Sequence, residues 1–185
     1  MKKLLSITSA LAIILTLATT STVNAAKPEK ARKLENAKHI VNLRAGIDRH
    51  RERAWYWQDV MFVRRHSTNY SENKTKSVVY LRWLRKTWKA RHEIAKRKAS
   101  QPPHYNEWLC IHSKEGSWTD PGAPYYGGLQ MDESFQRSYG WRLYNKKGTA
   151  DNWTPLEQMW VAERAFSSGR GFYPWPNTAR YCGLI

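Results

Sequence analysis

The chain has 185 residues and a formal net charge of +16, with 31 Lys and Arg against 15 Asp and Glu. This length is enough for one hydrophobic core, or a small core with an accessory region, and excludes several large domains. Two cysteines and scattered histidines do not make a metal-ligand set. Ten Trp and ten Tyr are many beside four Phe, and such side chains fill cores or stack on sugar rings.

The first 25 residues predict a secretory signal peptide. Two lysines precede an apolar run over residues 4–18, and Val23–Ala25 fits a small-residue cleavage site. The alternative is an uncleaved membrane anchor, but hydroxyl residues interrupt the run and it is short for a span of ~20 residues. We therefore expect a soluble mature protein that begins at Ala26 and lies outside the cytoplasm.

Residues 26–100 are expected to form a basic helical region, since residues 27–100 hold 21 Lys and Arg against 7 Asp and Glu. Apolar residues spaced by three and four predict a first helix, with the stripe Ile40, Leu43, Ile47, His50, Ala54, Trp57 and Met61. His50 is interpreted as a tolerated member of this stripe. After a polar turn at 67–73, a second helix is predicted over about 77–98. The polar connection suggests an antiparallel hairpin, and the alternative is that each helix packs separately on the rest of the chain.

Residues 101–185 are expected to form a second, neutral unit, with eight basic and eight acidic residues. It follows a loop signal, Ala-Ser-Gln-Pro-Pro, at 99–103. The pattern then predicts a helix over 106–115, a loop at 119–124 and a short strand over 125–131, whose two glycines permit close backbone approach.

The rest of this unit is predicted to be helical. Asp132 is expected to cap a helix that ends near Gly140. Thr154-Pro-Leu-Glu157 predicts another helix start, because Thr caps, Pro takes the first position and Glu reaches back. Gly169 is a plausible stop, and a short turn is expected at 177–181. The predicted fold class is mainly α, a small helical domain with a short β element.

Four spaced motifs occur in order in this unit. Trp108 lies seven residues before Glu115, and Gly and Trp follow Glu115 closely. The later motifs are Tyr125–Gln130 (Tyr-Tyr-Gly-Gly-Leu-Gln), then Glu157-Gln158 with Ala162-Glu163-Arg164, then Trp175-Pro176 near Cys182. With these motifs, residues 104–182 resemble the transglycosylase-like, or resuscitation-promoting-factor, branch of the lysozyme superfamily. The resemblance implies an α+β lysozyme-like domain in which Glu115 is the catalytic acid.

The chain departs from the family pattern in two places. The family usually places Cys directly before the Glu, whereas Cys110 lies five residues before Glu115. The loop between Glu115 and Gly127 is also a few residues shorter than is usual in the family. In an oxidising compartment Cys110 and Cys182 can pair, which would hold the segment of Glu115 to the C-terminus and contribute about 3–5 kcal/mol.

The position of Glu115 calls for an explanation, because the dipole of a helix disfavours a negative charge at its C-terminal end. Trp118, Tyr125 and Tyr126 are expected to form an apolar wall beside it. In such surroundings a carboxylic acid can protonate the leaving oxygen of a glycosidic bond. The alternative is a solvated glutamate at a helix end.

A hydrolase normally uses a second carboxylate. The candidates are Asp120, which suits a turn, Asp132, which suits a cap, and Glu133, which suits a first helical turn. None stands out, and this favours the lytic-transglycosylase route, in which the 6-hydroxyl of the muramic acid attacks C1. Attack by water, as in a muramidase, stays open.

The other candidate site residues each have two interpretations. Gln130 is expected on the strand facing Glu115, where its amide binds an N-acetyl group or only the backbone. Tyr126 either stacks on a sugar or belongs to the core. Trp118 and Trp175 suit the core by base rate, with sugar stacking as the alternative. Glu163 is interpreted as part of an ion pair or as a buried acceptor.

The sequence as a whole predicts a secreted, wall-associated, monomeric glycosidase that cleaves the β-1,4 bond from N-acetylmuramic acid to N-acetylglucosamine in peptidoglycan, without cofactor or metal. The alternatives are a non-catalytic wall-binding protein and a cationic membrane-active protein. The basic helices could be a solvated face, could bind an anionic wall polymer such as teichoic acid, or could lie on a membrane. We favour the polymer; nucleic acid fits the charge but not the expected compartment.

Overall fold

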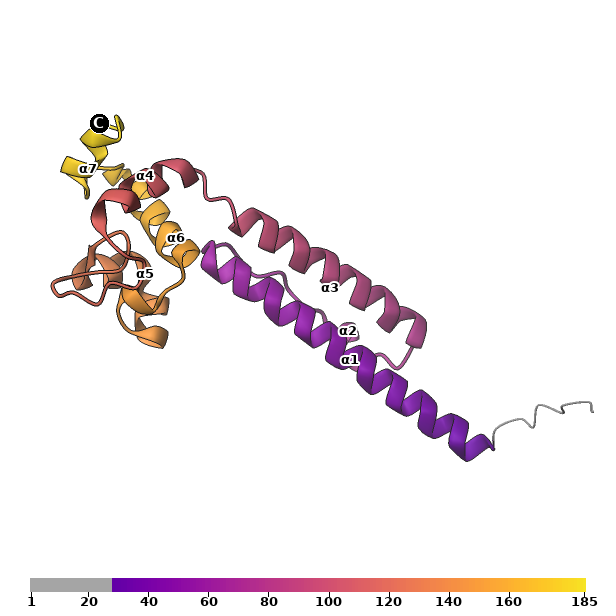
Figure 1. Cartoon of the computed structure of the whole chain (residues 1–185). Coiled ribbons are helices and arrows are strands. Elements are labelled where there is room, and N and C mark those ends of the chain that lie inside the picture. Colours follow the sequence, from indigo (N-terminus) through magenta and orange to yellow (C-terminus); the bar gives the residue numbers. More distant parts are fainter. Residues whose placement is uncertain (1–27) are drawn as a thin grey trace, which may run out of the picture.

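The computed structural model describes residues 28–185, so the predicted signal peptide lies outside the described residues. Figure 1 shows an elongated arm made of two long helices, with a smaller helical domain at one end. The described chain is mainly helical and holds one two-stranded sheet. The predicted fold class, mainly α with a short β element, is therefore confirmed.

The arm consists of α1 (Glu29–Val60), α2 (Tyr70–Lys74) and α3 (Val78–Ala99). The two long helices pack on each other through an apolar stripe that Leu43, Ile47, Ala54, Leu81, Leu84 and Trp88 form. Their regular spacing by three, four and seven is what places these side chains on facing sides. The short α2 falls at the end of the predicted turn and is capped by Asn69, whose side chain accepts from the backbone of Glu72.

The two long helices run in the same direction, so the prediction of an antiparallel hairpin is wrong (Figure 1). His39 lies 3.4 Å from Arg82, measured from Nε2 to Nη2, and the His50 and His92 rings lie 5.8 Å apart. Later residues of α1 thus meet later residues of α3. Since the helices pack on each other, the alternative of separate packing is wrong as well.

The connection over residues 61–77 makes the parallel arrangement possible, because it runs back along the helix pair (Figure 1). Trp55 Nε1 donates to the carbonyl of His66 at 2.8 Å, and Trp88 Nε1 donates to Glu72 Oε2 at 3.2 Å. Further along, Arg44 donates to the carbonyl of Asn73 at 2.9 Å. Side chains of both long helices therefore hydrogen-bond to the connection over residues 61–77.

The domain contains α4 (Tyr105–Glu115), β1 (Tyr125–Tyr126), β2 (Met131–Asp132), α5 (Glu133–Lys147), η1 (Ala150–Asn152), α6 (Pro155–Ala165), η2 (Phe166–Arg170) and α7 (Pro176–Tyr181). Helix α6 contributes most to its core, with Met159, Val161, Ala162 and Ala165 buried. Trp108 of α4 and Trp153 before α6 are buried against the same core. Packing in this core thus accounts for part of the large number of Trp residues in the sequence.

The predicted helix starts in this domain are confirmed. Asp132 accepts from the backbone of Phe135 at 2.7 Å, and Thr154 and Glu157 form a reciprocal capping box. Helix α5 does not end at Gly140, as predicted, but continues to Lys147 with a kink there. A Cβ at Gly140 would stand 2.7 Å from the Trp153 ring, so glycine is required for close packing and does not stop the helix.

The predicted strand over 125–131 is instead a small hairpin. Tyr126 pairs with Met131 across an antiparallel ladder of two residues on each side. Gly127–Gln130 form the turn between them, in which Gly127 has φ +72° and Gln130 has φ +46°. Glycine adopts such values readily and glutamine rarely does. The turn therefore takes up most of the segment that was predicted to be a strand.

The arm joins the domain at α6. Trp160 Nε1 donates to the carbonyl of Ala99 at 2.8 Å, and Tyr56 donates its hydroxyl to Glu157 Oε1 at 3.3 Å. The Arg164 guanidinium lies 3.8 Å from the centre of the Phe62 ring. The C-terminal ends of α1 and α3 thus both contact one helix.

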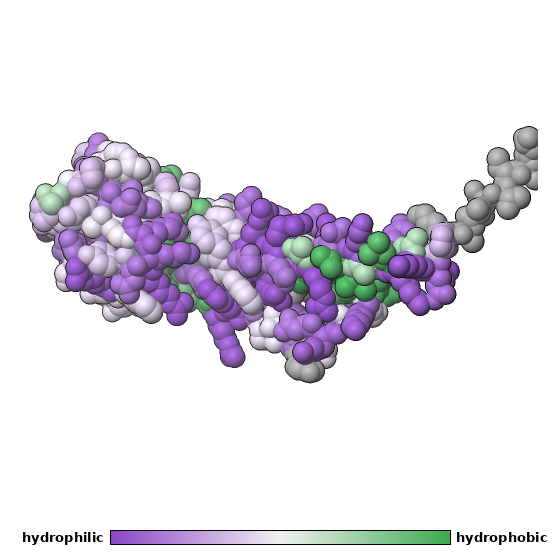
Figure 2. Space-filling model, turned by 90° about the horizontal axis from the view of Figure 1, so that it is seen from below, coloured by the Kyte–Doolittle hydropathy of each residue, from purple (hydrophilic) through white to green (hydrophobic). Residues whose placement is uncertain are grey.

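Within residues 28–185, no helix is both long and apolar enough to cross a membrane. The face shown in Figure 2 is largely hydrophilic, apart from an apolar area on the arm towards its free end.

Candidate active site around Glu115

Glu115 is the last residue of α4, and the extended backbone of Gly116 (φ 162°) ends the helix directly after it. Trp108 and Ile111 precede it at spacings of seven and four on the same helical face, and both are fully buried. Trp108 is fixed further because its Nε1 donates to Glu163 Oε1 at 2.8 Å. The buried face therefore directs the half-buried Glu115 side chain towards the rest of the domain.

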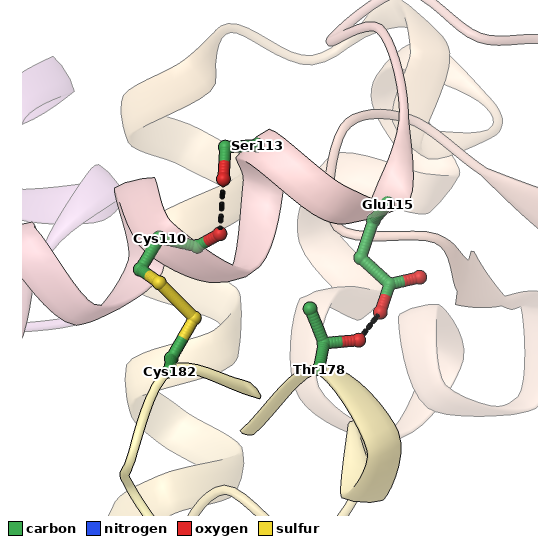
Figure 3. Close-up of a disulfide and its surroundings, with 5 residues drawn as sticks. All are labelled: Cys110, Ser113, Glu115, Thr178 and Cys182. Atoms are coloured by element: carbon green, nitrogen blue, oxygen red, sulfur yellow. Dashed lines mark hydrogen bonds between the residues drawn. A yellow bond between two sulfur atoms is a disulfide. The ribbon is translucent and has the colours of Figure 1, made fainter. Parts of the chain in front are cut away.

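Thr178 of α7 is the hydrogen-bond partner of Glu115, and its hydroxyl donates to a carboxylate oxygen (Figure 3). The disulfide between Cys110 and Cys182 joins α4 to the residue that follows α7, so the predicted disulfide is present. Figure 3 shows the disulfide and the Glu115–Thr178 pair connecting the same two segments. The acid is thus held by one covalent and one polar connection.

Glu115 opens onto a hollow of about 380 Å³. Three of the predicted substrate-binding residues line it, namely Tyr125, Gln130 and Trp175. A second hollow, of about 330 Å³, shares these three residues and Pro174 with the first and extends to Ser134, Tyr139 and Arg170. The two hollows therefore form one elongated cleft with Glu115 in one half, and we call this the Glu115 cleft.

Gln130 lies in the turn of the hairpin and not on a strand, which corrects the prediction. Its Nε2 donates to Asp120 Oδ2 at 2.8 Å and to the carbonyl of Gly127 at 2.9 Å. Both amide hydrogens are therefore used. Its Oε1 has no hydrogen-bond partner among residues 28–185, so the free capacity of this side chain is that of an acceptor.

The three further carboxylates considered for catalysis all have structural partners. Asp120 accepts from Gln130 and, through Oδ1, from the backbone of Gly122 at 3.0 Å. Asp132 caps α5. Glu133 accepts from Tyr144 and Arg137, and these two hydrogen bonds, Tyr144 first, lower its pKa.

Trp118 and Tyr126 do not line the Glu115 cleft, so the expected apolar wall has a different composition. The Trp118 ring stacks on His112 with centroids 3.8 Å apart, and His112 Nδ1 lies 3.0 Å from the carbonyl of Gly128. Both Trp118 and Tyr126 pack against the core of the domain. Tyr125 and Trp175 take their place beside Glu115.

Tyr125 and Trp175 differ in exposure. Tyr125 is 50% exposed, whereas Trp175 is 5% exposed and donates through Nε1 to the carbonyl of Leu129 at 2.6 Å. Trp175 is therefore a core residue with one edge in the cleft. Tyr125 is the aromatic side chain that a sugar ring can reach most easily.

Glu163 is a buried acceptor. It is 4% exposed and accepts from the backbone of His104 at 2.7 Å as well as from Trp108. Its neighbour Arg164 lies over Phe62 instead of pairing with it. This glutamate therefore holds the start of α4 through His104 and Trp108, and it does not line the Glu115 cleft.

Sequence reasoning missed several residues of the site. Thr178 and Asn177 on α7, with Lys114 on α4, line the hollow at Glu115, and Arg170 lies in the second hollow. None carries a local signal, because each reaches the cleft only through the packing of α7 and η2 on the domain. Pro176 at the start of α7 marked the helix but not its contact with Glu115.

Among the described residues, no group of three or more His, Cys, Asp or Glu is placed to hold a metal ion. Comparisons with protein-family models, with curated proteins and with solved structures find no match for this chain. The motifs and the geometry of the Glu115 cleft are therefore the features that point to a function.

Proposed function

We propose that this protein is a secreted peptidoglycan-cleaving glycosidase with Glu115 as its single catalytic acid and base. The observation that carries the proposal is a carboxylate at the end of α4, a helix with one buried face, held by Thr178 and facing an elongated cleft. The family resemblance of residues 104–182 and the predicted signal peptide support the same function. A surface glutamate without a role would need neither the hydrogen bond nor the cleft.

The shape and chemistry of the Glu115 cleft suit a glycan strand. Its two hollows meet at Tyr125, Gln130, Pro174 and Trp175, so a linear polymer can pass across these residues and occupy both halves. The exposed Tyr125 offers a stacking face, and Gln130 Oε1 can accept from an acetamido N–H or a sugar hydroxyl. These are the groups that N-acetylated sugars present.

In the first step, protonated Glu115 gives its proton to the oxygen that bridges N-acetylmuramic acid and N-acetylglucosamine. The bond from C1 of the muramic acid to that oxygen breaks, and the N-acetylglucosamine leaves with a 4-hydroxyl. Positive charge develops at C1 and is then quenched by a nucleophile. Thr178 holds the carboxyl group in a fixed orientation towards the cleft.

In the second step, the Glu115 carboxylate takes the proton from the 6-hydroxyl of the same muramic acid. The oxygen of that hydroxyl group then bonds to C1. The product is a 1,6-anhydro end and Glu115 is protonated again, so protons balance over the cycle. The nucleophile is part of the substrate, which gives it a high effective concentration. The structural roles of Asp120, Asp132 and Glu133 favour this single-acid route over one with a second catalytic carboxylate.

The test is mass spectrometry of the fragments that the protein releases from purified peptidoglycan. Glu115→Gln should lose cleavage by about 10³-fold or more while it keeps its fold and its binding to the wall. Glu107→Gln, two turns earlier on the same helix, is the matched control and should cleave as the wild type does.

Four outcomes separate the candidates. Anhydro-muramyl ends from the wild type alone support a lytic transglycosylase. Reducing ends support a muramidase and require a group that activates water. Cleavage by Glu115→Gln near the wild-type rate rejects the assignment, and binding without release from several wall types favours a non-catalytic wall-binding protein.

A further inference from the structure

Another hollow lies on the arm, separate from the two that form the Glu115 cleft. It measures about 540 Å³ and is lined by Leu43, His50, Arg82, Arg85, Lys86 and Lys89, which we call the basic groove. The four basic residues follow one another on α3 at spacings of three, one and three, so they share one helical face. Gly46 of α1 makes room for Arg85, since a Cβ there would stand 3.0 Å from Arg85 Nε.

The positive charge of the basic groove is not balanced by the protein. No carboxylate lines the groove, and within residues 28–185 none of its four basic side chains forms an ion pair. Arg82 instead lies 3.4 Å from His39 Nε2. Like charges four residues apart destabilise a helix by a few tenths of a kcal/mol per pair, and a bound anion would offset this repulsion.

His50 extends the groove onto α1. Its Nδ1 is buried and has no hydrogen-bond partner in the part of the chain that the structure describes. Burial, and after it the charges of His92, Arg85, Arg53 and Lys89, lower the pKa of His50 from the usual 6.5. A bound anion would oppose the effect of these charges, which makes His50 a reporter of occupancy.

The spacing of the charges indicates the ligand. Successive turns of α3 present basic side chains about 5 Å apart, which calls for an anionic group repeated at a similar distance along a chain. Phosphodiester chains carry one such charge in every repeat, and Arg and Lys are suited to phosphate oxygens. Among the described residues no Phe, Tyr or Trp lines the groove, so beyond the His50 ring it lacks the stacking surface that single-stranded nucleic acids use.

We propose that the basic groove is a binding site for a polyol phosphate chain, a phosphodiester polymer without bases. This function goes beyond the proposed glycosidase activity and does not depend on it. Leu43 would contact the aliphatic part of one repeat, while the basic side chains of α3 bind successive phosphates. Binding should weaken steeply as salt is added, because the contacts are charged and exposed.

The test is titration of purified protein with poly(glycerol phosphate). The groove variant carries Arg82→Gln, Arg85→Gln, Lys86→Gln and Lys89→Gln, and should bind at least about tenfold more weakly than the wild type. The control carries Lys30→Gln, Arg32→Gln, Lys38→Gln and Lys76→Gln, all at exposed positions of the arm, and loses the same charge. It should stay within about threefold of the wild type, and an equal loss in both variants overturns a discrete site.

Three further probes test the class of ligand. Polyglutamate of matched charge, oligo(dT) with the same number of phosphates and vesicles of anionic phospholipid should each bind more weakly than poly(glycerol phosphate). Equal or tighter binding to any of them overturns the proposal. Glu115→Gln should bind the polymer as the wild type does, so failure of the glycosidase assignment would leave this result unaffected.

A measurement on the wild-type protein removes the dependence on variants. The His50 ring is followed by NMR as a function of pH, with and without poly(glycerol phosphate). Its pKa should rise when the polymer is bound, because the phosphates offset Arg85, Lys89 and Arg53 around the ring. An unchanged His50 titration in the saturated protein overturns the proposed location.

Discussion

Thr178 hydrogen-bonds to Glu115 across 63 residues of sequence, and Cys182 is bonded to Cys110 across 72. The two connections are nested, since the earlier residue of α4 meets the later residue at the C-terminus. α4 and α7 are therefore held antiparallel at two points, about one and a half turns apart on α4. The candidate acid lies at the point nearer the cleft.

Removal of the Thr178 hydroxyl should affect turnover more than binding. Thr178→Val keeps the shape of the side chain but leaves the Glu115 carboxyl without its donor, so its orientation is no longer fixed. We expect kcat on peptidoglycan to fall by roughly 10- to 100-fold with little change in KM. Thr178→Ser keeps the hydroxyl and should recover most of the activity; a loss as large as that of Thr178→Val would mean that the methyl group matters instead.

The disulfide should contribute strongly to stability, because it closes a loop of about 70 residues. Cys110→Ala with Cys182→Ala should lower the free energy of unfolding by about 4 kcal/mol and the Tm by roughly 10 °C. Thermal unfolding followed by circular dichroism measures this. The wild type in reductant should match the double variant, and the double variant should not respond to reductant; a response would indicate another effect of the reducing agent.

Glu157 connects three parts of the chain and should be costly to neutralise. Its buried carboxylate accepts from Lys147 Nζ at 2.7 Å, from the backbone of Thr154 at 2.8 Å and from Tyr56 on the arm. Glu157→Gln leaves the Lys147 charge without its partner and should lower the free energy of unfolding by about 3 kcal/mol. Glu133→Gln, which removes an exposed partner of Arg137, is the comparison and should cost much less in the same denaturant titration.

The arm should lose stability as the pH falls below about 6.5. The rings of His50 on α1 and His92 on α3 lie beside each other. The pKa of each is lowered, mainly because the ring is buried. Around them, Arg53, Arg85, Lys89 and Lys96 lower these values further, and Glu93 opposes the effect at His92.

The direction of this pH effect follows from comparing the pKa values of the two histidines in the folded and the unfolded state. The unfolded chain takes up protons on these rings near pH 6.5 and the folded arm only at lower pH, so protonation favours unfolding in that window. The difference in Tm between pH 7.5 and pH 5 should shrink in His50→Gln with His92→Gln. An unchanged difference would assign the pH effect to other groups, His66 among them, since burial lowers its pKa too.

The sequence predicted best what depends on neighbours a few residues apart. The capping box of Thr154 and Glu157 and the cap of Asp132 involve hydrogen bonds to residues three positions away, so composition and spacing are sufficient. The helix over 106–115 is found within one residue of the predicted start. The pairing of Cys110 with Cys182 could be predicted because the chain has no other cysteine, once an oxidising compartment was assumed.

What depends on distant contacts was missed. The direction of α3 relative to α1 is set by the connection over residues 61–77, whose anchors on Trp55 and Trp88 have no periodic signal. Gln130 adopts a positive φ that its residue type does not suggest. Trp118 was expected in the wall beside Glu115, with the core as the base-rate interpretation, and its ring stacks on His112 and packs against the core.

Because α1 and α3 are parallel and both end at α6, the arm points away from the domain (Figure 1). The 32 residues of α1 span about 48 Å, and the basic groove lies part of the way along them. A protein held by this groove would sweep its cleft over a limited shell around the point of attachment. Glycan bonds inside that shell would meet the Glu115 cleft at a high effective concentration, and more distant bonds would be beyond its reach.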